Sequence, residues 1–174
     1  RGLGASALGI SSVGGTMNMV TKSTEAQKGG SAYFGIGNDG FRKYSVSFST
    51  GLMDNGWAIT FMGALNTGDG YVKGTNYEGW TYFGNISKVI NDHHKLSLTA
   101  FGAPQWHNQR STMHYIEDYK NSPDGGRFNN GYGYINGEAV GSGYGYNYYH
   151  KPQVSLNHYW TIDDKSTLTT SLYG

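Results

Sequence analysis

Hydrophobic and polar residues alternate with a period of two along much of the chain, most regularly in residues 57–67. From Trp57 onward every second residue is apolar or small, and the residues between are smaller or more polar (WAITFMGALNT). A period of two indicates a β-strand whose two faces meet different surroundings. The segment also has the length of a tilted strand that crosses a bilayer, about 9–11 residues, whereas the commonest strand length in globular proteins is about 5–6. We therefore expect this segment to be one strand of an antiparallel transmembrane β-barrel.

The same alternation predicts further strands, joined by connections of unequal length. The expected strands are residues 31–37, 44–51, 57–67, 80–90, 95–104, 152–162 and 166–173. Short turns are expected at 53–56, 91–94 and 163–165, a longer loop at 68–79, and a long irregular stretch at 105–151. Short turns at one end and long loops at the other are typical of outer-membrane barrels. On this interpretation the side chains that face lipid include Ile59, Phe61, Leu98 and Leu156.

Aromatic residues fall near the ends of the predicted strands, where barrels carry their interfacial girdles. The girdle at the periplasmic boundary would hold Trp57 and Trp160, and the outer one Tyr44, Trp80 and Tyr82. Two polar residues, Lys88 and His158, share the lipid-facing parity. Each lies near a strand end, where a lysine on the lipid face costs roughly 0–1 kcal/mol instead of about 2–4 at the midplane.

Composition supports an all-β fold and removes several function classes. The chain has 174 residues, with 28 Gly, 15 Tyr and no Cys. Its net charge of +1 offers no electrostatic basis for binding nucleic acid. No apolar run approaches the roughly 20 residues of a membrane helix. The chain starts at Arg1 and ends within a strand-like run, so we expect it to be a piece of a longer protein.

Residues 14–22 (GGTMNMVTK) carry a resemblance to a known family. With the small residues before them, they resemble the end of the plug domain in TonB-dependent outer-membrane transporters, where Gly-Gly-x-Ile-Asn-Ile-x-Thr-Lys is common. Methionine replaces both isoleucines, and a Gly/Ser linker is the alternative interpretation. Residues 102–105 (GAPQ) also resemble a run found in some of these receptors. The resemblance implies a 22-stranded barrel, with residues 1–27 ending the plug and residues 28–174 forming the first barrel strands.

The resemblance implies a function and its partners. Such a receptor lies in the outer membrane of a Gram-negative bacterium, binds a nutrient ligand at its external loops and imports it by energy-coupled movement of the plug. The implied partners are the inner-membrane TonB energy-coupling complex, outer-membrane lipid, an unknown nutrient ligand and a surface lipoprotein. Two alternatives remain open: a passive porin or adhesin-type barrel, which needs no plug, and a soluble β-sandwich or repeat protein with shorter strands.

The sequence offers no catalytic, metal or cofactor site, so we do not expect an enzyme. Residues 35–40 match G-x-G-x-x-G, but an alternating run follows them instead of the helix that a dinucleotide site needs, which favours a hairpin. The adjacent His93 and His94 lack further ligands at metal spacing. The candidate ligand contacts are Trp106, His107 and Arg110, beside a loop rich in Gly, Tyr and Asn. The alternative role of these three residues is to anchor the base of that loop.

Overall fold

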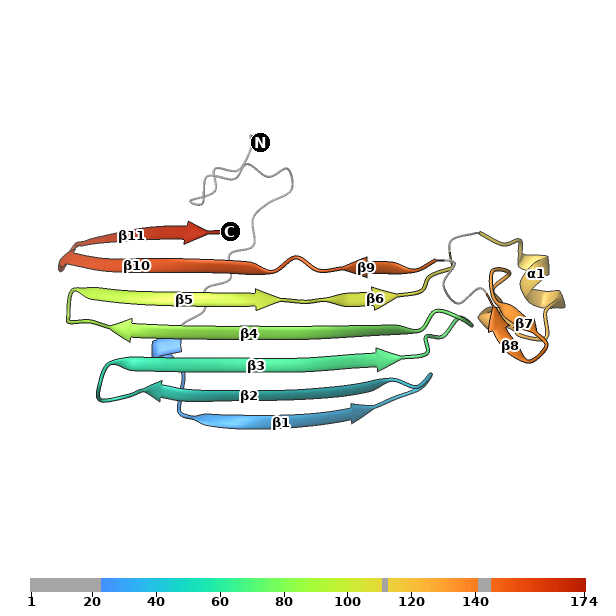
Figure 1. Cartoon of the computed structure of the whole chain (residues 1–174), viewed down its shortest axis with the longest axis horizontal. Helices are drawn as coiled ribbons and strands as arrows, with labels where there is room; N and C mark the ends of the chain where they lie inside the picture. Colours follow the sequence, from blue (N-terminus) through green and yellow to red (C-terminus); the bar gives the residue numbers. More distant parts are fainter. Residues whose placement is uncertain (1–22, 111–112, 141–144) are drawn as a thin grey trace, which may run out of the picture.

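One broad antiparallel β-sheet forms most of the molecule (Figure 1). The computed structural model describes residues 23–110, 113–140 and 145–174. The long strands are β1 (Gly29–Ile36), β2 (Arg42–Leu52), β3 (Trp57–Gly68), β4 (Tyr77–Val89), β5 (His94–Gly102), β10 (Gln153–Asp163) and β11 (Ser166–Tyr173). They lie side by side in this order, with β1 and β11 at the two edges. The predicted all-β antiparallel fold is therefore confirmed. The expected plug strand within residues 1–22 lies outside the described part of the chain.

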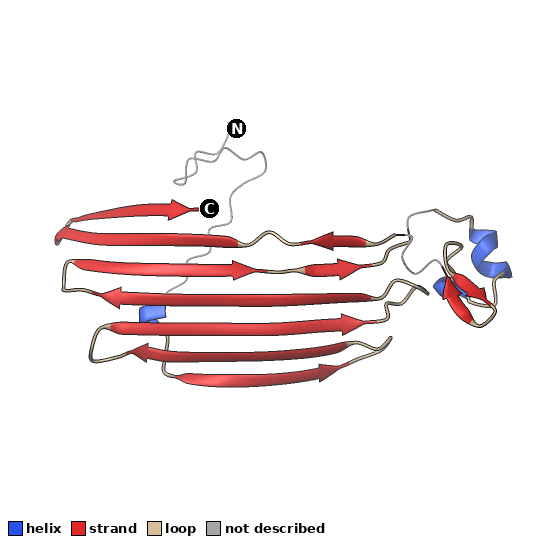
Figure 2. Cartoon of the chain, viewed as in Figure 1, coloured by secondary structure: helices blue, strands red, loops and turns tan. Residues whose placement is uncertain are grey.

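The segment 105–151 was predicted to be irregular, and this prediction was wrong. It contains strands β6 (Gln105–His107) and β9 (Asn147–Tyr149), which extend the sheet, and a separate hairpin of β7 (Gly133–Ile135) and β8 (Glu138–Val140). Helix α1 (Ile116–Asn121) and the 3₁₀ turn η2 (Gly125–Arg127) follow β6 and precede β7 in the chain. They lie beyond one end of the sheet (Figure 2). These elements are each 3 to 6 residues long, too short to produce a readable period.

The side chains of the sheet divide into two faces of opposite character. Strand register places Phe48, Phe61, Gly84, Ala100 and Val154 in one row across neighbouring strands. Residues that share this parity form what we call the apolar face, and the alternate residues form the polar face. The four residues predicted to share a face all belong to the apolar one, and they are exposed by 37 to 49%: Ile59, Phe61, Leu98 and Leu156.

The polar face, in contrast, contains buried hydrogen-bonded side chains. Asn85 is 1% exposed, and its amide donates to Ser97 Oγ at 2.9 Å and to Thr99 Oγ1 at 2.7 Å. The Ser87 hydroxyl donates to Asn85 Oδ1 at 2.8 Å. Buried polar groups need such partners, because an unmet donor or acceptor costs about 1–3 kcal/mol. Burial in this sheet is thus the reverse of a soluble sheet, whose apolar face is the covered one.

Glycines set two features of the strands where the backbone has positive φ. In the β1–β2 turn Asp39 and Gly40 have φ of 55° and 68°, which confirms the hairpin predicted for the glycine-rich residues 35–40. Gly51, with φ of 64°, lies in a register shift of β2. A Cβ added there would lie 3.1 Å from the backbone nitrogen of Lys28. The glycine therefore lets the segment that follows η1 (Ser23–Glu25) approach the sheet closely.

The β2–β3, β4–β5 and β10–β11 turns lie together at one end of the sheet (Figure 1). The β3–β4 loop and the insertion after β6 lie at the other end, together with the short β1–β2 turn. At the short-turn end the Lys88 ammonium lies 5.1 Å from the centre of the Trp57 ring and donates to Asn55 O. His94 stacks on His158 and on Trp160 there, with ring centres 5.3 Å and 5.6 Å apart. Lys88 thus lies near the end of its strand, as expected. The same expectation for His158 was wrong, because His158 is in the middle of β10, opposite Leu96 of β5. Among the described helices none is long and apolar enough to cross a membrane.

Candidate functional site

The candidate site lies at the long-loop end of the sheet, where β6 extends the line of β5 along β4 (Figure 1). Pro104 separates the two strands because it has no N–H for the ladder, and its carbonyl accepts from Trp80 N at 2.8 Å. After this break β6 pairs with both β4 and β9. Register places Gln105 in one row with Gly79, Asn66, Lys43 and Gly35, so β6 and β9 continue the sheet at the level where β1 to β4 end. We call β6, β9 and the paired end of β4 the shelf.

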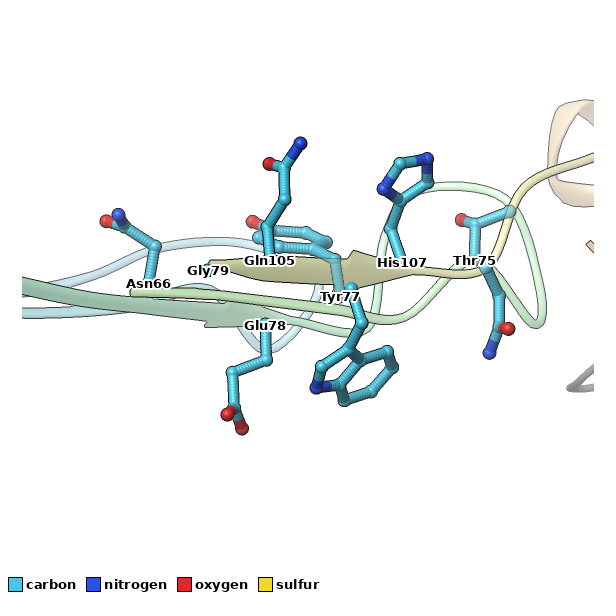
Figure 3. A pocket seen from close by; sticks show the side chains of 9 residues that line it. Asn66, Thr75, Tyr77, Glu78, Gly79, Gln105 and His107 are labelled. Atoms are coloured by element: carbon cyan, nitrogen blue, oxygen red, sulfur yellow. The ribbon is translucent and has the colours of Figure 1, made fainter. Parts of the chain in front are cut away.

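A hollow of about 420 Å³ opens on this shelf. Its lining residues come from β3, β4, β6 and the loops beside them: Asn66, Thr75, Tyr77, Glu78, Gly79, Gln105, Trp106, His107 and Asn108. Figure 3 shows Asn66, Gln105 and His107 projecting to one side of the sheet and Glu78 to the other. By strand parity the first side is the polar face. The volume is within the range of small-molecule sites, about 300–1,000 Å³.

Register explains how distant residues meet at this hollow. One row across the sheet joins Asn66, Gly79, Gln105 and Tyr149, and the next row joins Gly68, Tyr77, His107 and Asn147. Gly79 has no side chain, and a Cβ added there would touch nothing within 4 Å except Gln105 Cβ at 3.7 Å. Space therefore remains between the Asn66 and Gln105 side chains, and Gly79 forms its floor.

Charged groups lie close to the two rows, and Lys43 is the next residue of the first row, beside Asn66. On the opposite face Glu78 accepts a hydrogen bond from Trp80 Nε1 at 2.8 Å. The Lys43 ammonium lies 5.8 Å from the Tyr33 ring centre, and the Lys151 ammonium lies 5.4 Å from that of Tyr149. Both lysines thus lie against aromatic rings. The hollow offers amide, imidazole and phenol groups that donate and accept hydrogen bonds, together with the Glu78 carboxylate.

The structure brings together two of the three residues singled out by sequence. His107 borders the hollow on the polar face, and its neighbour Trp106 borders it with the opposite parity and stacks on Tyr146, ring centres 6.1 Å apart. Arg110 instead lies against the loop insertion. Its guanidinium donates to Phe128 O at 3.3 Å and lies 5.4 Å from the Tyr119 ring centre. These contacts are those of a residue that holds the loop in place.

The insertion of residues 113–140 is attached to the tips of the long strands. Arg127 forms an ion pair with Asp39 in the β1–β2 turn, donates to Tyr71 O at 3.2 Å and lies 4.8 Å from the Tyr71 ring centre. Lys73 forms an ion pair with Asp124. The insertion is therefore fixed to two separate loops beside the hollow.

Polar contacts complete the structure around the hollow. Asn108 is 7% exposed and donates from Nδ2 to Asn76 Oδ1 at 2.7 Å, while its own Oδ1 is buried with no hydrogen-bond partner among the described residues. In the insertion Tyr132 and Tyr134 join their hydroxyls at 3.1 Å. This hydrogen bond, together with partial burial, raises the pKa of Tyr132 above its ordinary value.

Sequence reasoning missed most of the residues that line the hollow on the polar face. Asn66, Tyr77 and Gln105 carry no motif, and they meet only because β4 pairs with β3 on one side and with β6 on the other. A three-residue strand gives no periodic signal of its own. The usable signal was Pro104, which marks where one strand ends and a new register begins.

The described residues hold no group of three or more His, Cys, Asp or Glu side chains arranged to bind a metal. The adjacent histidines lie in separate contacts: His93 Nδ1 is 2.8 Å from Thr161 O, and His94 Nδ1 is 3.1 Å from His158 Nε2. Comparisons with protein-family models, with curated proteins and with solved structures gave no match.

Proposed function

We propose that the chain forms part of the wall of a TonB-dependent outer-membrane transporter, which binds a nutrient ligand at its long-loop end and imports it. In this proposal the apolar face meets outer-membrane lipid, and the polar face lines a lumen occupied by a plug. Residues 28–174 supply wall strands of a 22-stranded barrel, and residues 1–27 end the plug.

The observation that carries this proposal is the reversed burial of the two sheet faces. Large apolar side chains are exposed on five neighbouring long strands, with Phe48 at 52%, Phe61 at 49%, Ile86 at 44%, Leu98 at 45% and Leu156 at 41%. Leu168 of β11 extends this surface with 48% exposure. A surface of this kind in water would draw molecules together, because contiguous exposed apolar patches rarely exceed a few hundred Å². In the proposed arrangement, lipid covers this apolar surface and removes it from water.

Strand length and polarity along the strands support the same arrangement. Leu65, the partner of Trp80, follows Trp57 by eight residues, which is about 27 Å along a strand. At the usual tilt of 35–45° this gives about 20 Å of height, close to the apolar band of about 25 Å in outer-membrane barrels. Within the described strands the apolar-face residues between these two tryptophan levels are uncharged, apart from Lys88 at the short-turn boundary.

The transporter class, as opposed to any outer-membrane barrel, is supported by the resemblance of residues 14–22 and 102–105 to the family. A porin or an adhesin-type barrel would account for the sheet equally well, but it needs no plug sequence before the first strand. An insertion fixed over the long-loop end also suits a receptor, because recognition usually lies in loops on a rigid scaffold.

The test is performed in the source bacterium with the full-length protein. We expect the protein in the outer-membrane fraction, and a strain lacking it to lose growth on one nutrient of a candidate panel. Uptake of that nutrient should stop when a protonophore removes the proton-motive force. Uptake that continues with the protonophore would favour a passive porin, and recovery of the protein in the aqueous extract without detergent would overturn the membrane assignment.

A further inference from the structure

We propose that the short-turn end of the apolar face binds the headgroup of a phospholipid that carries both a phosphate and a primary ammonium, as phosphatidylethanolamine does. This inference goes beyond the proposed function but rests on its membrane part, because it takes the apolar face as the surface that meets lipid. The site joins a lysine and two histidines on the sheet to aspartates in the turns beside them.

The cationic part of the site is on the apolar face, where it would meet a phosphate. Trp57, Lys88, Leu96 and His158 form one row across neighbouring strands. The Lys88 ammonium lies 5.1 Å from the centre of the Trp57 ring and donates to Asn55 O. It forms no ion pair with any carboxylate of the described residues. Two of its three N–H groups therefore remain for a lipid phosphate.

A pair of imidazoles adds hydrogen-bond donors in the same region. His94 Nδ1 lies 3.1 Å from His158 Nε2, so one ring donates to the other. In the neutral pair this leaves one outer ring nitrogen as a donor, and one added proton makes both outer nitrogens donors. Trp160 stacks on His94 with ring centres 5.6 Å apart and orients that ring. A phosphate, whose oxygens accept hydrogen bonds, suits these donors.

The acidic part of the site lies in the turns, further from the middle of the face. Each of the three short turns at this end contains an exposed aspartate: Asp54 follows β2, Asp92 follows β4 and Asp164 follows β10. Among the described residues none of these three carboxylates is in an ion pair, and Lys165 is the one lysine in these turns. Positive groups are thus followed by negative ones toward the turns. The headgroup has the matching order, because its phosphate lies nearer the acyl chains than its ammonium does.

This order of charges selects between headgroups. A primary ammonium donates hydrogen bonds to carboxylates, whereas the trimethylammonium of phosphatidylcholine has no N–H to donate. Phosphatidylglycerol has no cation for the turn aspartates, and its net negative charge is repelled by them. The zwitterionic lipid with a primary ammonium is therefore the one that matches both parts of the site.

Native mass spectrometry tests the site on the full-length protein, released from micelles that contain equal amounts of phosphatidylethanolamine, phosphatidylcholine and phosphatidylglycerol. We expect phosphatidylethanolamine to be retained about fivefold more than either other lipid. Lys88→Gln removes the charge and should bring the three lipids close to equal retention. The matched control is Lys95→Gln, which should change nothing, because Lys95 is at the same end but on the polar face, 4.7 Å from the Tyr159 ring centre.

A double variant tests the acidic part of the site. Asp54→Asn combined with Asp92→Asn leaves the cationic groups in place, so the preference should move to phosphatidylglycerol. Three results would overturn the inference: equal retention of the three lipids by the unmodified protein, a preference of that protein for phosphatidylglycerol, or a preference for phosphatidylethanolamine that Lys88→Gln leaves intact.

This inference and the proposed function fail separately. If the protein lies in the outer membrane and supports proton-motive-force-dependent uptake, yet retains the three lipids equally, the lipid site is wrong and the transporter assignment stands. If the protein retains phosphatidylethanolamine through Lys88 but is recovered in the aqueous extract without detergent, the lipid site stands and the transporter assignment is wrong.

Discussion

At the residue scale, the position of Asn85 shows how this chain distributes polarity. An asparagine at 1% exposure is unusual, and here it makes hydrogen bonds to three hydroxyl side chains on two strands. One residue further along the same strand, Ile86 is 44% exposed. Neighbouring residues of a strand face opposite sides, so the polarity of each side is set residue by residue.

A lysine scan at adjacent positions of β3 tests which face meets lipid. Phe61→Lys places a charge in the middle of the apolar face, and we expect it to lower the free energy of unfolding by about 2–4 kcal/mol in a bilayer. Met62→Lys, one residue on, faces the polar side and is 38% exposed, so it should cost less than about 1 kcal/mol. Urea unfolding of the full-length protein in phospholipid vesicles measures both. Equal costs, or a larger cost for Met62→Lys, would contradict the assignment of faces.

At the element scale, one arginine of the loop insertion contacts two separate loops. Arg127 is the last residue of the 3₁₀ turn η2. Its side chain forms an ion pair with Asp39 and contacts both the carbonyl and the ring of Tyr71. Its side chain is 46% exposed, so the ion pair itself contributes little, and the contact with the Tyr71 ring adds a comparable amount. Several weak contacts from Arg127 thus help to position the insertion, whose helix α1 has no buried residues.

Replacing Arg127 should loosen the insertion without unfolding the sheet. We expect Arg127→Ala to cost about 1 kcal/mol locally, which corresponds to about fivefold faster cleavage by chymotrypsin within residues 113–140. Lys120→Ala is the control, because its ion pair with Glu117 is 4.0 Å long and both side chains are about 70% exposed. Equal cleavage rates in the two variants would show that Arg127 does not hold the insertion.

At the scale of the whole molecule, the four tryptophans mark three levels along the sheet. Trp57 and Trp160 lie at the short-turn end, Trp80 lies at the level of Leu65, and Trp106 lies on the shelf opposite Glu78, two residues beyond Trp80 along β4. Aromatic residues at two levels are what a membrane-spanning barrel places at its two interfaces. The shelf, by the same measure, would stand outside the bilayer.

Quenching by brominated lipids tests these levels directly. In variants that retain a single tryptophan within this segment, we expect fluorescence from Trp57, Trp160 and Trp80 to be quenched most by bromine near the headgroups. Trp106 should be quenched little, because it lies beyond the boundary. Strong quenching of Trp106, or of none of the four, would contradict the proposed position of the sheet in the membrane.

The strands could be predicted from sequence because their faces differ so strongly. Period-two alternation located all seven long strands, and for β11 it matched the observed bounds, Ser166–Tyr173. It also predicted that Ile59, Phe61, Leu98 and Leu156 share one face, which register confirms. The boundaries of β4 were less accurate, because Tyr77 to Gly79 pair with β3 without continuing the apolar alternation.

The sequence by itself determined the strands and the polarity of each face, because alternation is a local property of consecutive residues. Only the tertiary structure decided the hollow. Asn66, Gly79, Gln105 and Tyr149 are separated by up to 83 residues and become one row through the pairing of β3, β4, β6 and β9. Register between strands distant in sequence depends on backbone hydrogen bonds and packing over the whole sheet, which no window along the chain contains.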